Sequence, residues 1–510
     1  MTAGNQSAGL ANRVRLRRVG IDTYQQPVIY MHRDCPVCRS EGFEAHSRVR
    51  VDGPKGHIIA TLNVVANHIV SPEEAGLSEV AWRLLGAEEG DVARLSHPDP
   101  LVSLSHVRSK IYGHRLDRDA LSAIINDIVA GRFSDVQLSA FLTACAMNRL
   151  SFDEIKALTG AMVDAGDRLR WDHHTRVMDK HCIGGLPGNR TTLLVVPIVA
   201  AAGLLIPKTS SRAITSPAGT ADAMETLAPV DLSPDAMRRV VEREGGCIVW
   251  GGSVRLSPAD DVMIRVERAL DLDSEGQLVA SVLSKKIAAG STNVVIDIPV
   301  GSTAKVRTTE QARSLAASLR DVGGAFGLDV RILETDGSQP VGRGIGPALE
   351  AHDALAVLRR RDHAPADLRE RGLALAGEVL ELGGAAEAGA GARKAAELLD
   401  SGAAWSKMQS ICESQGGMRQ PPEAPYRKDV LATTSGRVAN IDNRRLARIA
   451  KLAGAPRAPA AGLLLHSRVG TLVNTGDPLL TIHAEAPGEL EYAHHYALAN
   501  RDALQIQEPV

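Results

Sequence analysis

An unbroken apolar run, residues 193–202, lies between two polar stretches, 179–192 and 208–220. Because the run is apolar on all sides, it predicts a fully buried helix. Further along the chain, short apolar runs alternate with segments of helical periodicity. The strands are predicted at 246–250, 293–300 and 330–334, and the helices at 259–270, 277–289 and from about 301 to 326. This alternation is typical of an α/β sheet with helices on its faces.

The first hundred residues have the pattern of a small β-rich domain. Short β-prone runs are separated by turn residues, at 28–31, 45–51, 56–65 and 92–96. One helix is predicted to begin at Ser71, because a capping Ser is followed there by Pro72 and two acidic residues. A linker is predicted at 97–100, where prolines alternate with polar residues.

A helical segment and a second β-rich segment complete the pattern. Apolar residues recur at helical spacing through 103–167, and capping boxes are predicted at Ser134 to Gln137 and at Ser151 to Glu154. From residue 429 onward, short β-prone runs return. They lie at 430–440, 462–465, 469–473 and 479–483.

The two polar stretches around the apolar run have the composition of an anion-binding site. The first combines three glycines and two threonines with Lys180 and Arg190, and the second holds six hydroxyls and two cations. Backbone amides at a helix start, supported by cations, suit an oxyanion such as phosphate. Taken singly, the first stretch is as consistent with a plain tight turn as with a ligand site, and the composition of the second favours a Ser/Thr-rich surface loop. Together they predict convergence on one anion, as neighbouring element ends converge in open α/β sheets.

Composition limits the partners. The net charge of −2 and an aromatic content of 3% argue against a nucleic acid held by bulk electrostatics or by base stacking. No apolar run reaches the roughly 18–20 residues of a membrane span, and residues 1–18 lack a signal-peptide core. We therefore expect a cytoplasmic protein with neither a nucleic-acid nor a membrane partner.

The six cysteines do not suggest a disulfide framework in a chain of 510 residues. Cys35 and Cys38 are spaced like zinc ligands, with His32 and His46 nearby, but the ligand set is incomplete. Structural thiols are therefore favoured over zinc. No cofactor and no metal are predicted, because no acidic cluster that would hold a metal is evident.

The two polar stretches resemble the signature of the thymidine/pyrimidine-nucleoside phosphorylase family. The sequence is most similar to the longer branch of this family, the archaeal-type AMP (nucleoside monophosphate) phosphorylases. The resemblance continues through 281–286, 300–305, 342–350 and the C-terminal region, and so covers most of the chain in order. It implies a pentosyltransferase that uses inorganic phosphate as a co-substrate and assembles as a homodimer or a larger homo-oligomer.

The resemblance also implies a fold class, a multidomain α/β protein in four parts. These are an N-terminal β-rich, barrel-like domain, a helical domain, a central α/β sheet domain that binds phosphate, and a C-terminal α+β domain of barrel-sandwich type. The expected bounds are 1–98; 99–175, to which 258–292 return; 176–257 with 293–425; and 426–510.

The site residues follow from the same resemblance. Positions that match phosphate contacts of the family motif are Lys180, Gly184, Gly185, Thr192, Ser210 and Thr220. Positions that match nucleotide contacts are Gly185, Ser211, Arg212, Ala213, Ile214, Thr215, Ser216, Thr220, Ser281, Lys285 and Lys305. Preorganised donors of this kind stabilise a transition state without a covalent intermediate.

Asp273 matches the residue that protonates the leaving base in the AMP-phosphorylase branch. From the sequence alone, Asp273 is equally explained as the N-cap of the helix predicted from residue 277, and the two roles are compatible. To act as an acid near neutral pH, its carboxyl group needs a raised pKa, which burial beside an apolar wall provides.

The predicted substrate is a nucleoside 5′-monophosphate. The shorter pyrimidine enzymes of the family contact the base with a Tyr and an Arg, and this chain has Ile264 and Glu267 at those positions. Losing a buried donor to a base carbonyl should weaken the binding of a pyrimidine substrate by on the order of several kcal/mol. Residues 211–216 follow the nucleotide-binding version, in which Arg212 is expected to bind the 5′-phosphate.

Two alternatives stay open, a thymidine or other pyrimidine nucleoside phosphorylase and a non-catalytic nucleotide-binding protein. The base and the sugar are not determined by the sequence. Two departures from the family pattern bear on phosphate binding. Cys182 stands where the family usually has Ser, and Pro217 removes a backbone N–H.

Overall fold

The structure, a computed structural model, describes residues 12–213, 216–270, 272 and 274–507. The chain divides into two compact units, residues 1–114 with 123–141 and residues 115–122 with 142–510. The boundary between the two units lies within residues 99–175, which were expected to form one helical domain. The division of the chain into four domains therefore stays a prediction. The two units are described separately.

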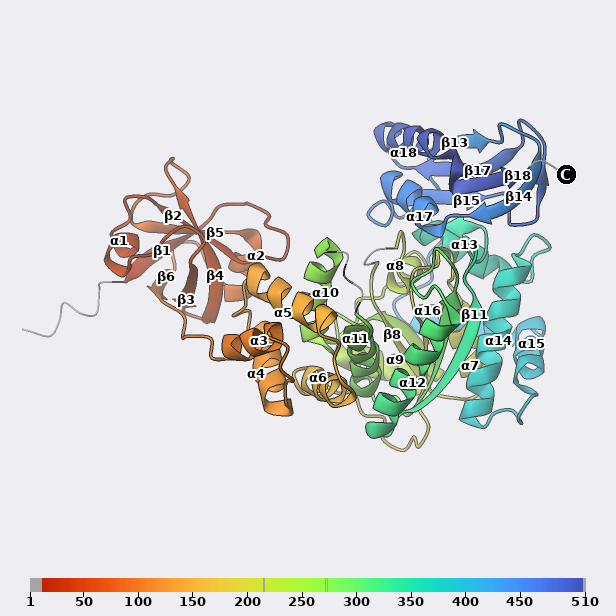
Figure 1. The fold of residues 1–510 in the computed structure, drawn as a ribbon, viewed down its shortest axis with the longest axis horizontal. Coiled ribbons are helices and arrows are strands. Elements are labelled where there is room, and N and C mark those ends of the chain that lie inside the picture. Colours follow the sequence, from red (N-terminus) through yellow and green to blue (C-terminus); the bar gives the residue numbers. More distant parts are fainter. Residues whose placement is uncertain (1–11, 214–215, 271, 273, 508–510) are drawn as a thin grey trace, which may run out of the picture. The chain divides into compact units, whose positions relative to one another are not determined.

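The first unit contains a closed barrel with the strand order β1-β5-β2-β4-β3-β6 (Figure 1). The strands are β1 (Arg13–Arg18), β2 (Val28–His32), β3 (Arg48–Gly53), β4 (Gly56–Val65), β5 (Glu74–Leu77) and β6 (Val92–Ser96). Closure leaves no sheet edge exposed, and alternate side chains such as Val49, Leu62 and Leu95 are buried inside. Two short helices accompany the barrel, α1 (Pro36–Glu41) and α2 (Glu79–Leu85).

The prediction of a helix that begins at Ser71 is wrong. The backbone N–H of Ser71 donates to Glu74 Oε2 at 3.0 Å, as in a capping box, but the chain then extends into β5. β5 pairs with β1 and β2, and these ladders outweigh the local helix signal. The helix begins instead at Glu79, where the hydroxyl of Ser78 accepts from the backbone N–H of Ala81.

Helices follow the barrel in the chain. They are α3 (Ser103–Ile111), α4 (Arg118–Val129), α5 (Asp135–Met147) and α6 (Phe152–Asp164). Both predicted capping boxes are confirmed. The N–H of Ser134 donates to Gln137 Oε1 at 2.8 Å, and the N–H of Ser151 donates to Glu154 Oε2 at 2.9 Å.

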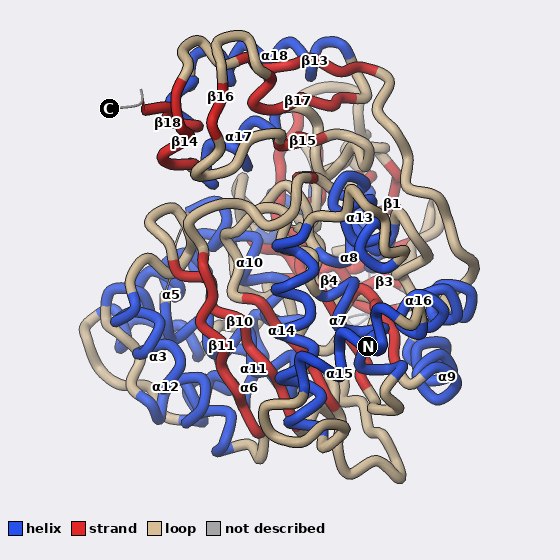
Figure 2. Tube along the Cα trace, turned by 90° about the vertical axis from the view of Figure 1, so that its right-hand side faces the viewer, coloured by secondary structure: helices blue, strands red, loops and turns tan. Residues whose placement is uncertain are grey.

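The second unit is built around parallel strands. β7 (Met178–Cys182), β10 (Asn293–Val300) and β11 (Asp329–Asp336) form one sheet in the order β11-β10-β7, and β8 (Ile206–Ser210) pairs with β9 (Gly246–Trp250). A parallel bridge between Val177 and Leu205 joins the two sheets beside β7. Figure 2 shows β10 and β11 side by side, flanked by helices. The sheet predicted from the alternating pattern is therefore confirmed as a mixed α/β fold.

Helices cover both faces of these strands. α7 (Thr192–Ala201) is the predicted buried helix, and α14 (Ala366–Gly383) packs against α7, β7 and β10. On the other face, α11 (Glu275–Ala288) packs against α6 and reaches β7 through Lys286. The remaining helices up to residue 414 are α8 (Thr220–Glu225), α9 (Pro234–Glu244), α10 (Pro258–Leu270), α12 (Thr309–Ala325), α13 (Pro347–Leu358), α15 (Gly391–Asp400) and α16 (Ala403–Ser414).

The C-terminal part contains two antiparallel sheets and two helices. One sheet has the order β12-β15-β17-β13 and the other β16-β14-β18. Their elements are β12 (Gly344–Ile345), β13 (Tyr426–Leu431), β14 (Gly436–Ile441), β15 (Gly462–Leu465), β16 (Leu472–Val473), β17 (Pro478–Ala484), β18 (Leu504–Gln507), α17 (Asn443–Leu452) and α18 (Pro487–Ala499). β12 comes from the α/β part of the chain, so this sheet ties the two parts together.

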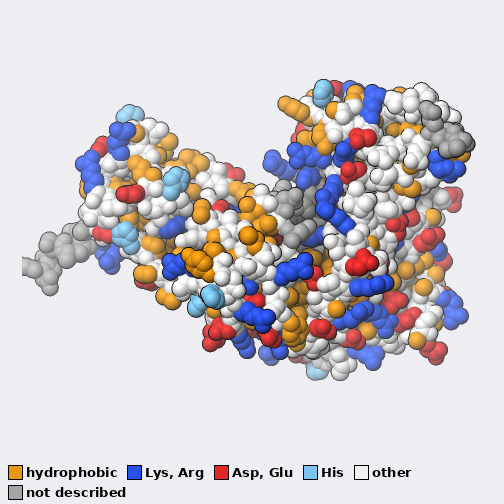
Figure 3. Space-filling model, viewed as in Figure 1, with side chains coloured by type: hydrophobic (Ala, Val, Ile, Leu, Met, Phe, Trp, Pro, Cys, Tyr) orange, Lys and Arg blue, Asp and Glu red, His pale blue; other side chains and the backbone are white. Residues whose placement is uncertain are grey.

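Among the described residues, no helix combines the length and the apolarity that crossing a bilayer requires. Lys, Arg, Asp and Glu side chains are interspersed on the face shown in Figure 3, in keeping with the net charge of −2.

Candidate active site

The first predicted anion-binding stretch begins on β7, at residues 179–182, and continues through the loop between β7 and α7. Gly185 has φ +95° in this loop, and a Cβ there would lie 2.8 Å from the backbone nitrogen of Lys305. Only glycine fits such a close approach with positive φ. The loop therefore lies directly against Lys305, a predicted nucleotide contact, and Thr192 begins the helix that follows.

Alternation along β7 divides its polar side chains between the two faces of the sheet. Lys180 and Cys182 face α7, whereas Asp179 and His181 face the opposite way, because successive strand residues point to opposite faces. The two faces carry separate polar clusters, and the cluster of Lys180 and Cys182 bonds to Thr191 and Asn189 of the loop that follows.

The cluster beside α7 ties the loop between β7 and α7 to strand β7. Lys180 is fully buried, and its Nζ donates to Thr191 Oγ1 at 2.6 Å. Asn189 Nδ2 donates to Cys182 Sγ at 2.9 Å and to Asp297 Oδ2 at 3.1 Å. Burial lowers the pKa of Lys180, and burial together with the nearby Asp297 raises that of Cys182, so Cys182 is a neutral thiol. A hydroxyl at position 182 is not needed to hold this network.

The opposite cluster places one carboxylate between two ammonium groups. Asp179 Oδ1 lies 3.1 Å from Lys208 Nζ, and Asp179 Oδ2 lies 2.8 Å from Lys286 Nζ. All three side chains are almost completely buried. Burial alone would raise the pKa of Asp179, but the two ammonium groups lower it below its ordinary value. The two lysines therefore hold Asp179 as a buried carboxylate.

Lys286→Met is expected to flatten the rise of stability with pH. Burial and the neighbouring Lys208 lower the pKa of Lys286 from 10.5 to about 7 in the folded protein. Between these two values the unfolded chain binds one more proton than the folded chain, so the free energy of unfolding rises with pH. The stability that Lys286 contributes in this way is complete above pH 10.5 and is lost as the pH falls through about 7. Denaturant unfolding of both proteins at pH 6.5, 8 and 9.5 measures the difference. Parallel pH profiles would contradict it.

The second stretch forms a tightly closed loop after β8. A Cβ on Gly219 would lie 2.6 Å from the backbone nitrogen of Ala213, so the loop folds back on itself. Asp222 Oδ2 accepts from the N–H groups of Ala213 and Gly219, at 2.6 and 2.8 Å, and closes the loop. Ser210 and Ser211 precede the loop, and Ser216 lies within it, its Oγ donating to the carbonyl of Ala218 at 2.8 Å.

Arg212 is held by carboxylates within the same loop. Its Nη1 and Nη2 donate to Glu225 at 2.5 and 2.9 Å, and Nη1 lies 3.4 Å from Asp222 Oδ1. Its guanidinium carbon stands 5.1 Å from the ring centre of Trp250. The hydrogen bonds to Glu225 raise the pKa of Arg212. A phosphate at Arg212 has to compete with Glu225.

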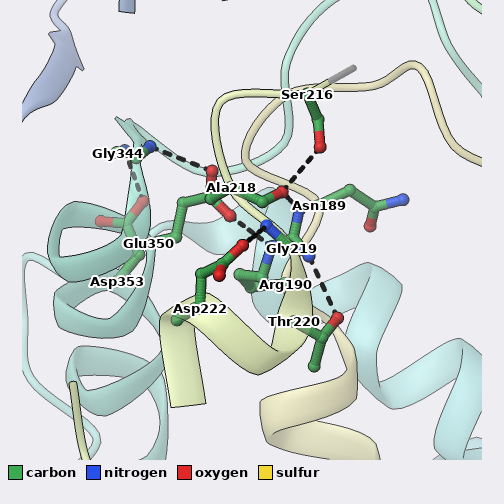
Figure 4. A network of polar contacts seen from close by, with 12 residues as sticks. Asn189, Arg190, Ser216, Ala218, Gly219, Thr220, Asp222, Gly344, Glu350 and Asp353 are labelled. Carbon is green, nitrogen blue, oxygen red and sulfur yellow. Dashed lines mark hydrogen bonds and ion pairs between the residues drawn. The ribbon is translucent and has the colours of Figure 1, made fainter. Parts of the chain in front are cut away.

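The structure brings the two predicted stretches together. Arg190, in the first stretch, donates from Nη1 to Thr220 Oγ1 at 3.0 Å and from Nη2 to the carbonyl of Ala218 at 3.1 Å (Figure 4). The segments therefore meet at the start of α8, where Thr220 is the first helical residue.

The predicted base contacts lie on α11. Ser281 and Lys285 are four residues apart on this helix, and the adjacent Lys286 reaches Asp179. Lys285 Nζ lies 2.5 Å from Asp260 Oδ2 on α10. Although burial lowers the pKa of Lys285, Asp260 raises it above its ordinary value. Lys285 is therefore a charged donor.

Three predicted residues, Asp273, Ile214 and Thr215, lie outside the described residues. The N-cap of α11 is Ser274, and both roles weighed for Asp273 stay predictions. Sequence reasoning assigned no role to the carboxylates that organise the site. These are Asp179, Asp222, Glu225 and Glu350.

Cys35 and Cys38 are buried in the core of the barrel and are not joined in a disulfide. A hydrogen bond from Cys38 lowers the pKa of the Cys35 thiol to about 6, although burial acts in the opposite direction. Over the described part of the chain, no three His, Cys, Asp or Glu side chains are grouped as metal ligands would be.

Three segments match families of known proteins. Residues 174–405 match the glycosyl transferase family, a/b domain, and residues 105–166 match its helical bundle domain. Residues 437–502 match the pyrimidine nucleoside phosphorylase C-terminal domain. In fold, the chain resembles anthranilate phosphoribosyltransferase from Thermus thermophilus, with a TM-score of 0.50 and 21% identity, covering 61% of this chain and 98% of that one.

Curated relatives match over nearly the whole length. A "putative thymidine phosphorylase" from Polaromonas sp. is 62% identical over 98% of this chain and 97% of its own. "Putative thymidine phosphorylase 1" from Acidovorax sp. is 62% identical over 99% of both chains, and a Legionella pneumophila (strain Paris) relative, also a "putative thymidine phosphorylase", is 61% identical over 97% and 96%. The chain therefore belongs to the thymidine/pyrimidine-nucleoside phosphorylase family and is a pentosyltransferase.

Proposed function

We propose that this enzyme cleaves the N-glycosidic bond of a nucleoside 5′-monophosphate with inorganic phosphate. The products are a free base and a sugar 1-phosphate, which for AMP is ribose 1,5-bisphosphate. The observation that carries the proposal is the junction of two hydroxyl- and cation-bearing loops at Arg190 and Thr220, beside the lysines of β7, β8 and α11. Assembly as a homo-oligomer is part of the same proposal.

Each part of the reaction has candidate residues. Phosphate would be held by Lys180, the amides of Gly184 and Gly185, and the hydroxyls of Thr192, Ser210 and Thr220. Fixed donors of this kind stabilise developing charge without reorganising during the reaction. Ser281, Lys285 and Lys305 would orient the base and the sugar, and Asp273 would protonate the departing base.

The choice of substrate rests on two opposing observations. Ile264 and Glu267 offer no cationic donor for a pyrimidine carbonyl, which favours the nucleotide reading. The relatives' names and the engagement of Arg212 by Glu225 favour the second candidate, phosphorolysis of thymidine or another pyrimidine nucleoside, because no 5′-phosphate has to displace Glu225 in that reaction.

A substrate panel separates the candidates. We expect phosphate-dependent base release to be faster with AMP, CMP or UMP than with adenosine or thymidine, and much slower in Asp273→Asn because the departing base loses its proton donor. Base release is followed by chromatography with and without phosphate. Fastest turnover of thymidine would establish the second candidate. Nucleotide binding without base release, with no effect of Asp273→Asn on any rate, would indicate a non-catalytic protein.

A further inference from the structure

Arg190 uses all three of its guanidinium nitrogens within the protein. Nε donates to Glu350, Nη1 donates to Thr220 Oγ1 and Nη2 donates to the carbonyl of Ala218 (Figure 4). The side chain is 11% exposed and that of Glu350 is fully buried. Arg190 therefore links the loop before α7 to the segment before α8, and its donors are occupied rather than aimed at a ligand.

Glu350 holds the Nε side of the Arg190 guanidinium. It lies on the first turn of α13, and its Oε1 accepts from the N–H of Gly346 at 3.0 Å while Oε2 pairs with Arg190. A buried carboxylate is tolerated only when it is paired and hydrogen-bonded. The planar fork of Arg190 is suited to this multiple pairing, because its donors point in fixed directions.

The segment that carries Glu350 is anchored in the C-terminal part of the chain. β12 pairs with β15, with Gly344 opposite Leu464 and Ile345 opposite Leu463. The N–H of Ala348 donates to the carbonyl of Pro459 at 2.9 Å. The position of Glu350, and through it that of Arg190, therefore depends on residues 459–464.

We propose that Glu350 is a positioning residue that holds Arg190 as a strap between the two phosphate loops, so that the C-terminal part of the chain sets the geometry of the phosphate site. The inference rests on the proposed function for the identity of the ligand. Thr220, which matches a phosphate contact, is the group that the strap positions. Loss of the strap is expected to weaken phosphate binding more than it slows the chemical step at saturating phosphate.

The test replaces the pair by apolar side chains. In the double variant Arg190→Met with Glu350→Leu, no buried charge is left unpaired, and such exchanges are often neutral for stability. We expect a thermal midpoint close to wild type, a KM for phosphate raised by about tenfold or more, and kcat at saturating phosphate within about threefold. A wild-type KM in the folded double variant would overturn the proposal, because the pair would then be merely structural.

A second variant covers a failure of the double variant to fold. Arg190→Lys keeps the positive charge but loses the planar fork. It is expected to raise the KM for phosphate in the same way. If Arg190 acts only through its charge, Lys replaces it and KM stays at the wild-type value, which contradicts the proposal.

Asp353→Asn is the matched control, an acid-to-amide change one turn further along α13. Asp353 Oδ2 accepts from the N–H groups of Arg343 and Gly344, at 2.6 and 2.7 Å, and so supports the same turn without being part of the strap. We expect it to leave the KM for phosphate within about twofold. An equal rise in KM would attribute the effect to the turn and overturn the role of Glu350.

Calorimetric titration with inorganic phosphate separates this inference from the proposed function. If wild type binds phosphate but releases no base from any substrate, the proposed reaction fails, and a weaker Kd in the double variant still supports the strap. An unchanged Kd overturns the strap alone. If wild type neither binds phosphate nor releases base, both fail.

Discussion

Lys180→Met is expected to lower kcat/KM for phosphate by about 10²–10³-fold, the effect of removing one preorganised donor from an anion site. Lys180 is fully buried beneath the loop, where its Nζ holds Thr191 Oγ1 at 2.6 Å. Methionine fills a similar volume without charge, so the phosphate loses an electrostatic partner in surroundings that screen charge weakly. Initial rates at varied phosphate measure the effect.

Lys428→Met is the control for this experiment. Lys428 lies on β13, is 38% exposed and pairs with Glu491 at 2.9 Å on the surface. The same chemical change there is expected to leave kcat/KM for phosphate within about twofold, since surface pairs contribute little. Equal effects of the two substitutions would contradict a phosphate role for Lys180.

Asp179→Asn is expected to lower the free energy of unfolding by about 3–5 kcal/mol, because it leaves two buried ammonium groups without their carboxylate. Lys208 and Lys286 have exposed fractions of 4% and 3%, so water does not replace the lost partner. Denaturant unfolding at pH 6, below the pKa of about 7 of Lys286, measures the change. The loss should be smaller at higher pH, where Lys286 is neutral in the folded protein.

Asp235→Asn provides the comparison. Asp235 is 81% exposed and lies 3.9 Å from Arg238 in a surface pair on α9. Its replacement is expected to change the free energy of unfolding by less than about 0.5 kcal/mol. If Asp179→Asn were equally mild, the buried cluster would have to be solvated or already neutral, and the electrostatic description of the site would be wrong.

The parts of the fold that the sequence predicted are those in which local pattern and tertiary packing agree. β10 has the predicted bounds, 293–300, because a β-branched, nearly all-apolar run is also what a strand covered on both faces requires. α7 was predictable for the same reason, since a helix apolar on every side has no stable position outside the core.

Two kinds of element were predicted wrongly or missed, the first because the deciding contacts are distant in sequence and the second although a local signal was present. Ser71 and Glu74 make a local capping hydrogen bond, yet pairing of β5 with β1 and β2 extends the chain there. In the C-terminal part, α17 and α18 were not predicted between the β-prone runs, although Asp442 caps α17 through the N–H groups of Arg444 and Arg445. Asp442 is therefore a local N-cap signal from which the start of α17 could have been predicted.

The site could be predicted as loops but not as a network. Arg190 and Glu350 are 160 residues apart, and nothing local shows that they meet. The cluster around Asp179 was not predicted either, because residues 178–182 were not recognised as a strand and the alternation that separates Asp179 from Lys180 was therefore missed. Its partners Lys208 and Lys286 come from β8 and α11, whose placement only the sheet order provides.

A crystal structure with bound inorganic phosphate is the decisive experiment on whether residues 179–192 and 208–220 bind phosphate for attack on a sugar carbon. We expect phosphate between these loops, with oxygens within hydrogen-bond distance of Lys180, Ser210 and Thr220. Phosphate bound elsewhere, or no phosphate between the loops at concentrations that saturate turnover, would contradict it.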